Sequence, residues 1–170
     1  MPATPAELFA FLDRLGIAHT TVSHPPLFTV EESRVLRGQI AGAHTKNLFL
    51  RAKNGTLFLV VALEDARIDL KRLHQRLGAA RFSFGSADLL RTVLGVEAGA
   101  VTPFAVINDR HGAVSVVLDA AMMRYAVLNY HPLDNTRTTT IHRDDLVRFL
   151  EASGHPPLVI AVSNGAGTAP

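Results

Sequence analysis

Three short stretches of this 170-residue chain carry residue types that could hold and polarise a substrate. The first is the loop from Gly99 to Pro103, where glycine leaves the backbone bare and proline fixes the direction of the chain. Successive N–H groups in such a loop can form a concave donor site for an oxyanion or a phosphate. Taken alone, such a loop between a helix and a strand is usually a simple connector. Its interpretation therefore depends on the residues that the fold brings beside it.

The other two stretches contribute polar side chains. Lys46 and Asn47 precede an apolar run, and Lys46 is one of only three lysines beside fourteen arginines. A lysine at the start of a strand can act as a compact, movable ammonium, and an asparagine can donate to a carbonyl or hydroxyl. His131 lies in a polar loop, where it could orient a hydroxyl or act as acid or base. The alternatives are a solvated lysine and a loop histidine without a special role.

The remaining histidines are interpreted as structural: His19, His24, His44, His74, His111, His142 and His155. The chain has no cysteine, which excludes disulfides, thiolate ligands and thiol nucleophiles. It also lacks the His-Glu-x-x-His, phosphate-loop and Gly-x-Ser-x-Gly motifs. We therefore expect no metal and no cofactor. Hydrolysis at this site would need a positioned water and a preorganised oxyanion site.

Charge is unevenly distributed along the sequence. The net charge is +2, yet residues 67–81 hold five basic residues and one acid, so the rest of the chain sums to −2. A basic stripe on a nearly neutral protein is typical of a nucleic-acid-binding surface, although a solvated helix face has the same composition. No apolar run approaches the roughly 20 residues of a membrane span, so no membrane association is expected.

The pattern of elements predicts one α+β domain over residues 1–162, built on a mixed, largely antiparallel sheet flanked by helices. Helices are expected after the caps Thr4, Thr29 and Ser86, over 69–77, and over 144–152. Strands are expected at 17–22, 48–50, 57–61, 104–107, 114–118, 125–129, 136–141 and 158–162. Two hairpins are expected, one around Asn54-Gly55 and one joining 104–107 to 114–118. Residues 163–170 are predicted to form a disordered tail.

Taken in order, several of these motifs resemble the YbaK-like aminoacyl-tRNA deacylases, relatives of the editing domain of bacterial prolyl-tRNA synthetase. The segments that carry the resemblance are 24–32 (HPPLFTVEE), 46–50 (KNLFL), 99–104 (GAVTPF), 107–109 (IND) and 131–135 (HPLDN). The similarity covers about residues 5–162. His142 departs from the pattern, which often has a small helix-capping residue there.

The resemblance implies the YbaK-like fold and hydrolysis of mischarged aminoacyl-tRNA without a cofactor. Its catalytic positions correspond to Lys46, Gly99, Thr102, Pro103 and His131. Its substrate-binding positions correspond to Phe28, Asn47, Ala100 and Val101. In this family the Gly-x-x-x-Pro loop presents N–H groups to the scissile carbonyl, and a ribose hydroxyl of the terminal adenosine helps to position water.

The branch that the chain most resembles clears alanyl-tRNA(Pro), because a synthetase site made for proline cannot exclude the smaller alanine. The implied partner is the tRNA(Pro) acceptor stem with its aminoacylated 3′ adenosine, in the cytoplasm. Prolyl-tRNA synthetase or an elongation factor could be a protein partner. Arg51 and Arg81 are candidates for reading the acceptor stem, either at base edges or at phosphates. Cysteinyl- or seryl-tRNA deacylation, and a non-catalytic module that binds tRNA or a synthetase, remain as alternatives.

Overall fold

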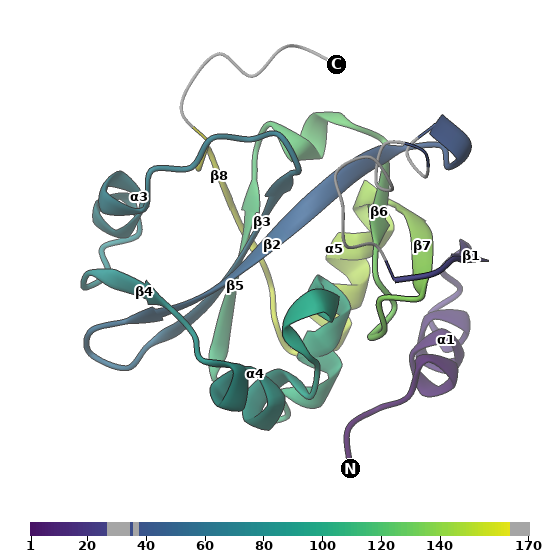
Figure 1. The fold of residues 1–170 in the computed structure, drawn as a ribbon, viewed down its shortest axis with the longest axis horizontal. Coiled ribbons are helices and arrows are strands. Elements are labelled where there is room, and N and C mark those ends of the chain that lie inside the picture. Colours follow the sequence, from purple (N-terminus) through teal and green to yellow (C-terminus); the bar gives the residue numbers. More distant parts are fainter. Residues whose placement is uncertain (27–34, 36–37, 164–170) are drawn as a thin grey trace.

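A mixed sheet of eight strands organises the part of the chain that the computed structural model describes, residues 1–26, 35 and 38–163 (Figure 1). The strands run in the order β1-β7-β6-β2-β3-β5-β8, and β4 pairs with β2 beside that path. Their bounds are β1 His19–Ser23, β2 Ala43–Ala52, β3 Leu57–Leu63, β4 Phe82–Phe84, β5 Val114–Asp119, β6 Val127–Tyr130, β7 Arg137–His142 and β8 Leu158–Ile160. The expected α+β class with a mixed sheet is confirmed.

Strand β2 is the central element of this sheet. It pairs antiparallel with β3 and β4, and its first residues pair in parallel with β6. The expected Asn54-Gly55 hairpin joins β2 to β3: the Gly55 N–H donates to Ala52 O at 2.8 Å, and Gly55 has a φ of +95°, which favours glycine. The pairs β3–β5 and β5–β8 are also parallel, but the longest ladder, β2–β3, and three further pairs are antiparallel, so the sheet is mixed and largely antiparallel.

The helices begin and end where local chemistry favours them. Their bounds are α1 Pro5–Arg14, α3 Leu70–Arg76, α4 Ala87–Leu94 and α5 Arg143–Ala152. Thr4 and Glu7 form a capping box at α1, and Ser86 caps α4, which ends at Gly95 in the left-handed conformation. His142 caps α5 through its ring, since Nδ1 accepts from the Asp144 N–H at 3.2 Å. The residue that departs from the family pattern thus still performs the capping function.

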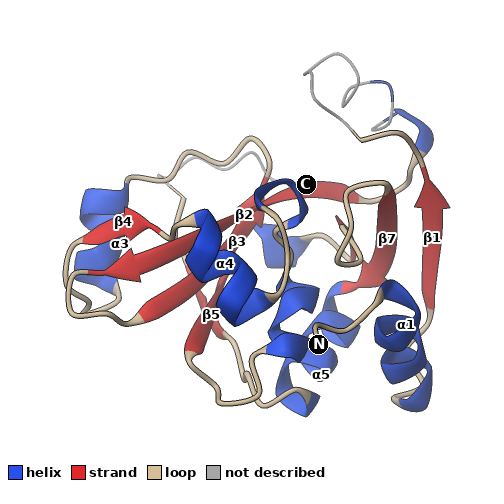
Figure 2. Ribbon diagram, turned by 60° about the horizontal axis from the view of Figure 1, so that its bottom comes forward, coloured by secondary structure: helices blue, strands red, loops and turns tan. Residues whose placement is uncertain are grey.

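Two hydrophobic clusters lie on the two faces of the sheet. The larger combines side chains of α1, α4 and α5 with Phe49, Leu59 and Val61. The smaller combines Leu73 of α3 with Leu50 and Val60. Alternation along β2 and β3 explains this division, because successive residues point to opposite faces. Figures 1 and 2 show α3 and β4 at one end of the molecule, and α1 and α5 toward the end that carries β1 and β7.

The expected strand at 104–107, and with it the second hairpin, is wrong. These residues lie in a 3₁₀ helix, η2 Pro103–Asn108, and β5 instead pairs in parallel with β3 and β8. Thr102 is the N-cap: its side chain accepts from the Phe104 N–H at 3.3 Å, and Pro103 occupies the first helical position. Local capping therefore outweighs the strand propensity of the apolar run.

The helix expected after Thr29 lies outside the described residues, as does the tail from 164 to 170. Two further 3₁₀ helices are η1 Ala98–Ala100 and η3 Met122–Arg124. No helix in the described ranges is long and apolar enough to cross a membrane.

Candidate active site

The Gly99 loop presents bare backbone to the surface. Gly99 is exposed in the first turn of η1, where N–H groups lack intrahelical acceptors. The N–H of Ala100, by contrast, is not available to a ligand, because it donates to Glu97 O at 2.9 Å. Thr102 and Pro103 are buried and hold the end of the loop against the core. The loop therefore has a rigid base and an exposed glycine, whose N–H has no acceptor among the described residues.

The fold brings this loop against the loop of His131. A Cβ added to Gly99 would lie 3.2 Å from Asn135 Nδ2, so the two motifs are in close contact although 32 positions separate Gly99 from His131. Beneath them, the rings of Phe104 and Tyr130 meet edge-on with centroids 5.9 Å apart. Two of the predicted stretches are thus held together by a packed aromatic pair. Asn135 belongs to the 131–135 segment but is not among the predicted site residues, because only the folded chain brings it against Gly99.

His131 has a defined tautomer in this loop. Its Nδ1 lies 2.8 Å from Arg137 O, and because a carbonyl oxygen only accepts, Nδ1 carries the proton. Burial and the neighbouring His24 lower the pKa of His131, and they outweigh the Arg137 hydrogen bond and the Asp134 charge, which act in the opposite direction. The ring is therefore neutral at pH 7, and Nε2 has a lone pair that can accept a proton or a hydrogen bond.

His24, interpreted from the sequence as structural, lies beside His131. The two ring centroids are 6.2 Å apart. Its Nδ1 donates to Pro25 O and its Nε2 accepts from Thr138 Oγ1, both at 2.8 Å, so the ring is well anchored. The backbone before it is anchored too, as the His24 N–H donates to Thr136 O at 2.8 Å. In the sequence, His24 is marked only by its place in the 24–32 segment. That segment does not show that His24 lies beside His131 in the fold.

The His131 loop also contains the only described non-glycine residue with positive φ, Leu133 at +72°. A left-handed leucine is uncommon and is held by its surroundings. Here Asp134 braces the loop, since its Oδ1 accepts from both the N–H and the hydroxyl of Thr136. A strained but well-braced loop is a feature that clusters at functional sites.

Lys46 and Asn47 point to opposite faces of β2. Lys46 pairs with Ala62 on the α3 face, and Asn47 pairs with Val61 on the face of the Gly99 and His131 loops. The ammonium of Lys46 donates to Ala66 O, and the residue is half-buried. The buried Oδ1 of Asn47 has no hydrogen-bond donor within the described part of the chain. These two neighbours would therefore contact different parts of a bound molecule.

Arg51 and Arg81 lie where β2 meets β4. Arg51 stands opposite Ser83 in the register, and Arg81 O accepts from the Lys53 N–H at 2.9 Å. Both side chains are exposed, and neither forms an ion pair with a described residue. The structure thus brings the two arginines to one end of the sheet, away from the Gly99 loop. Phe28, the remaining predicted contact, lies outside the described residues.

The Gly99 and His131 loops provide backbone donors and a neutral imidazole, whereas the Lys46 ammonium lies on the other face of β2. No group of three or more His, Asp or Glu side chains suited to a metal ion occurs among the described residues. Such an arrangement can polarise an ester carbonyl and accept a proton from water or a hydroxyl.

Comparison with known proteins defines the class. The family described as "Aminoacyl-tRNA editing domain" matches residues 24–149, and the chain belongs to this family. Its fold and activity class are those of an aminoacyl-tRNA deacylase, an ester hydrolase.

Named relatives narrow the comparison. The chain is 38% identical over 149 residues to "Prolyl-tRNA editing protein ProX" of Acetoanaerobium sticklandii, covering 87% of this chain and 91% of that protein. It is 38% identical over 157 residues to "Prolyl-tRNA synthetase associated domain-containing protein 1" of Danio rerio, covering 91% and 85%.

Solved structures share the fold at lower identity. A protein described as a candidate trans-editing enzyme for prolyl tRNA synthetase superposes with a TM-score of 0.73 at 18% identity, over 97% of this chain and all of the other. The hypothetical protein APE2540 gives 0.74 at 19% identity, over 95% and 100%.

Proposed function

We propose that this protein hydrolyses the ester bond of mischarged alanyl-tRNA(Pro), releasing alanine and tRNA(Pro). The observation that carries the proposal is the exposed Gly99 loop, whose glycine N–H has no hydrogen-bond acceptor among the described residues, held against the loop of a neutral His131. The name of the ProX relative supports tRNA(Pro) as the nucleic acid. The proposal places the protein in the cytoplasm, with prolyl-tRNA synthetase or an elongation factor as a candidate partner.

In the proposed reaction, the oxygen of a water molecule attacks the carbonyl carbon of the ester. The negative charge that develops on the carbonyl oxygen is stabilised by N–H groups of the loop from Gly99 to Thr102 other than that of Ala100, which is bonded to Glu97 O. His131 Nε2 accepts a hydrogen bond from the ribose hydroxyl that positions this water, or from the water itself. The bond between the carbonyl carbon and the ribose oxygen then breaks, and the ribose oxygen takes the proton that the attacking water has lost.

The remaining contacts in the proposal hold the substrate. Ala100, Val101 and Phe28 border the amino acid, and Asn47 offers its amide to the ester or adenosine. The Lys46 ammonium has three donors, so it can bind a phosphate or ribose oxygen while keeping its bond to Ala66 O. A small pocket would admit alanine and exclude proline on size, whereas cysteine and serine are close enough in size to be competitors.

The test is hydrolysis of purified alanyl-tRNA(Pro) in the presence of EDTA, beside prolyl-, cysteinyl- and seryl-tRNA. We expect alanine release far above buffer hydrolysis and no release of proline. Faster release of cysteine or serine than of alanine would change the proposed substrate but would still support deacylase activity. Alanine release no faster than in buffer would contradict the proposal.

The variant Gly99→Ala tests the backbone donors, with an expected loss in kcat of about 10²–10³-fold, the range for one oxyanion donor. Gly99 does not have a positive φ, so the backbone tolerates alanine there. A matched control is Gly38→Ala, at a glycine without positive φ and with open space around its Cβ. The same change made in an Asn135→Ser background removes crowding by the amide. Restored activity in that double variant would show that crowding, not lost access to the N–H, caused the defect.

A further inference from the structure

An aromatic side chain is held in solvent on β4. Phe84 is 64% exposed, whereas Phe82, two residues earlier, packs edge-on against Phe58 with ring centroids 5.2 Å apart. The chain after Phe84 is fixed: the Gly85 N–H donates to Phe49 O at 2.9 Å, and a Cβ on Gly85 would lie 2.3 Å from the Phe49 ring. The exposed ring is therefore presented by a rigid backbone, not by a free loop.

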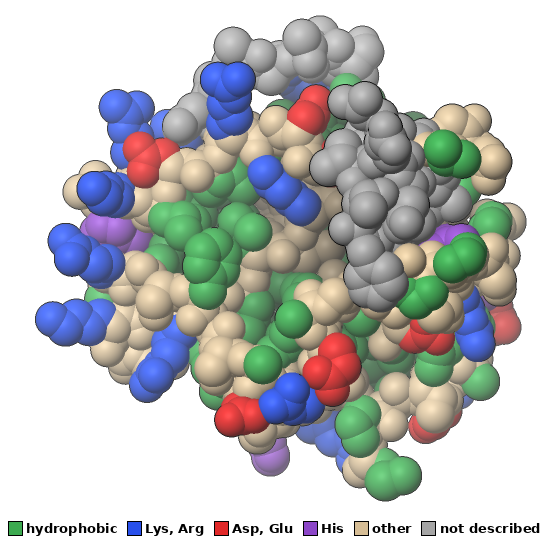
Figure 3. Space-filling model, in the orientation of Figure 1, with side chains coloured by type: hydrophobic (Ala, Val, Ile, Leu, Met, Phe, Trp, Pro, Cys, Tyr) green, Lys and Arg blue, Asp and Glu red, His purple; other side chains and the backbone are tan. Residues whose placement is uncertain are grey.

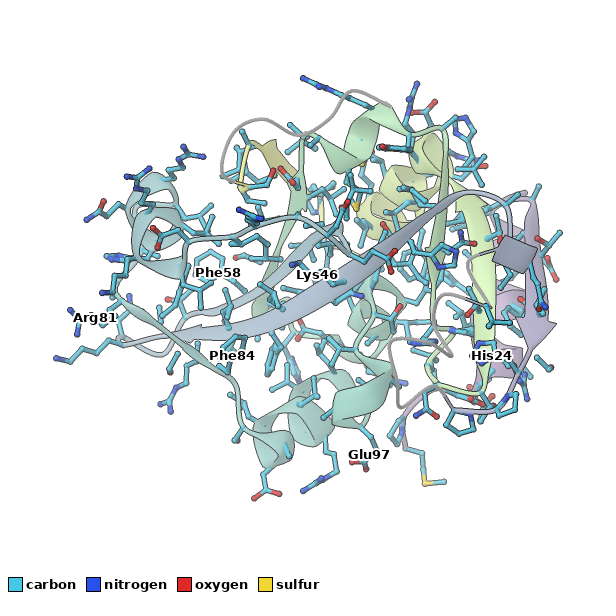
Figure 4. The ribbon with its side chains drawn as sticks, turned by 45° about the horizontal axis from the view of Figure 1, so that its top comes forward. His24, Lys46, Phe58, Arg81, Phe84 and Glu97 are labelled. Carbon is cyan, nitrogen blue, oxygen red and sulfur yellow. The ribbon has the colours of Figure 1, made fainter. Side chains whose placement is uncertain are left out.

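Phe84 shares a face of the sheet with Lys46. Its register partner is Leu50, and Leu48 and Lys46 follow on the same side of β2 because alternate residues point to the same face. Leu50 and Lys46 are four residues apart, which corresponds to about 13 Å along a strand. Figure 4 shows Lys46 on β2, between Phe84 toward the β4 end and His24 on the side of β1. This spacing fits a few nucleotides of single-stranded nucleic acid, at about 3.4 Å each when stacked.

The surroundings of Phe84 favour an anionic occupant. Hydrophobic side chains gather between α3 and β2 in Figure 3, and Lys and Arg side chains border them on the side of α3. The segment 67–81, which includes α3, carries Arg67, Lys71, Arg72, Arg76 and Arg81 against the single acid Asp69. Asp69 caps α3 by accepting from the Lys71 N–H at 3.0 Å, and among the described cationic side chains only that of Arg72 approaches it, at 3.8 Å. An aromatic ring inside a basic border matches a nucleotide chain, whose bases stack and whose phosphates need cations.

We propose that Phe84 is a stacking platform for a base in the single-stranded 3′ end of the tRNA, upstream of the aminoacylated adenosine. The proposal rests on the proposed function, since it assumes that the terminal adenosine is held near Lys46. Stacking on an aromatic ring tolerates any base. Phe84 therefore increases the affinity for the tRNA and guides the course of its 3′ end, whereas other residues recognise the identity of the bases. A protein partner at this ring is the competing occupant, which the experiment below separates.

The experiment measures binding of a fluorescent RNA hairpin that carries a single-stranded 3′ extension, beside the same hairpin with a blunt end. Phe84→Ala should weaken binding of the extended hairpin about 5- to 150-fold, the range for one base–aromatic stack of about 1–3 kcal/mol. Binding of the blunt hairpin should not change. Phe84→Trp should bind like the wild type, and Phe84→Leu should resemble Phe84→Ala. Val159→Ala, at another exposed apolar residue in β8, is the control and should behave as wild type.

The outcomes separate this proposal from the proposed function. If wild type and Phe84→Ala bind the extended hairpin equally well, the stacking proposal is overturned and a protein partner becomes the occupant of the ring. The same conclusion follows if Phe84→Ala weakens binding of both hairpins to the same extent. A selective loss in a protein that fails to hydrolyse alanyl-tRNA(Pro) supports stacking and removes the proposed function. Because stacking neutralises no phosphate, the salt dependence of binding should be the same in Phe84→Ala and wild type.

Discussion

At the scale of single residues, the hydrogen bonds that each side chain already makes within the protein determine which of its atoms can still contact a substrate. His131 uses its Nδ1 proton on Arg137 O, so only Nε2 remains for a substrate. His24 uses both ring nitrogens within the protein, through Pro25 O and Thr138 Oγ1. Two histidines that look alike in the sequence therefore have different chemical capacities.

The pH dependence of deacylation follows from this difference. Because burial and His24 lower the pKa of His131, the active neutral ring persists as the pH falls to the ordinary histidine value of about 6.5. We expect kcat/KM to stay level from pH 8 to 6.5 and to fall only below that value. His131→Gln should lower kcat by about 10²–10⁴-fold, the range for general acid–base catalysis.

His24→Gln is the matched control for this pH profile. It removes a neighbour that lowers the pKa of His131, so the inflection should move upward while most of the activity is kept. A wild-type inflection above pH 6.5, or a downward shift in His24→Gln, would show that His131 is not the titrating group.

At the scale of elements, the sequence predicts most of the fold because capping and turn chemistry are local. Thr4-Pro5, Ser86 and Asn54-Gly55 each mark a boundary that the structure confirms. The same logic explains the wrong strand at 104–107. Thr102-Pro103 is another cap followed by proline, and it begins a 3₁₀ helix. The strand is predicted there because the residues that follow are apolar.

The spatial part of the site could not be predicted in this way. The contact of Gly99 with Asn135 and that of His24 with His131 depend on how β1, β6 and β7 are ordered in the sheet. Local patterns do not determine this order. Lys46 and Asn47 share one motif in the sequence, yet strand alternation places these adjacent residues on opposite faces of β2.

The last part of the Gly99 segment fixes neighbouring elements. Asn108 Nδ2 donates to Leu94 O at 2.8 Å, at the end of α4. Asp109 Oδ2 lies 2.8 Å from His155 Nε2 and also accepts from the Val114 N–H at 2.8 Å. Both partners of the His155–Asp109 pair are buried. This residue pair connects η2, the start of β5 and the chain after α5.

Removal of the Asp109 charge should destabilise the fold. Burial by itself would raise the carboxyl pKa, but hydrogen bonds from His155, Val114 N–H and Ala113 N–H lower it below its usual value. A lowered pKa adds stability above the unfolded-state value of about 3.9, and this stability is lost as pH falls through the folded-state pKa. Asp109→Asn should reduce the free energy of unfolding at pH 7 by about 3–5 kcal/mol, as for other broken buried pairs.

Urea unfolding at a series of pH values measures this effect. The gap between wild type and Asp109→Asn should narrow below pH 4. Asp88→Asn, which removes an exposed partner of Arg91, is the control and should change stability little. Equal effects of the two substitutions would contradict a special role for the buried pair.

At the scale of the whole molecule, the proposed chemistry and the proposed tRNA contacts lie on different parts of the sheet. The Gly99 and His131 loops pack against the larger core, whereas Arg51 and Arg81 lie at the end that carries β4. Arg51 is five residues beyond Lys46 on β2, or about 16 Å along the strand. A substrate that reaches both places must be long, as an acceptor stem with a single-stranded end is.

Selection between tRNAs is the function that we assign to this distant end. A pocket that accepts alanine must still spare correctly charged alanyl-tRNA(Ala), so the difference has to be read from the nucleic acid. An arginine can bond two acceptors on a guanine edge, for about 1–3 kcal/mol of discrimination, or it can contact phosphates without reading sequence. Exposed arginines without an ion pair among the described residues, such as Arg51 and Arg81, are available for either role.

Kinetics on the two tRNAs decide between these roles. Arg51→Ala and Arg81→Ala are compared with wild type for deacylation of alanyl-tRNA(Pro) and alanyl-tRNA(Ala) over a range of salt concentrations. We expect base reading, in which the preference for tRNA(Pro) falls about 5- to 150-fold while hydrolysis of alanyl-tRNA(Ala) changes little. If both rates fall together and the salt slope decreases by about one, the arginine contacts phosphate only, and the selecting residue lies elsewhere on the surface. Arg143→Ala, at the first residue of α5 directly after β7, is the control and should leave both the preference and the salt slope unchanged.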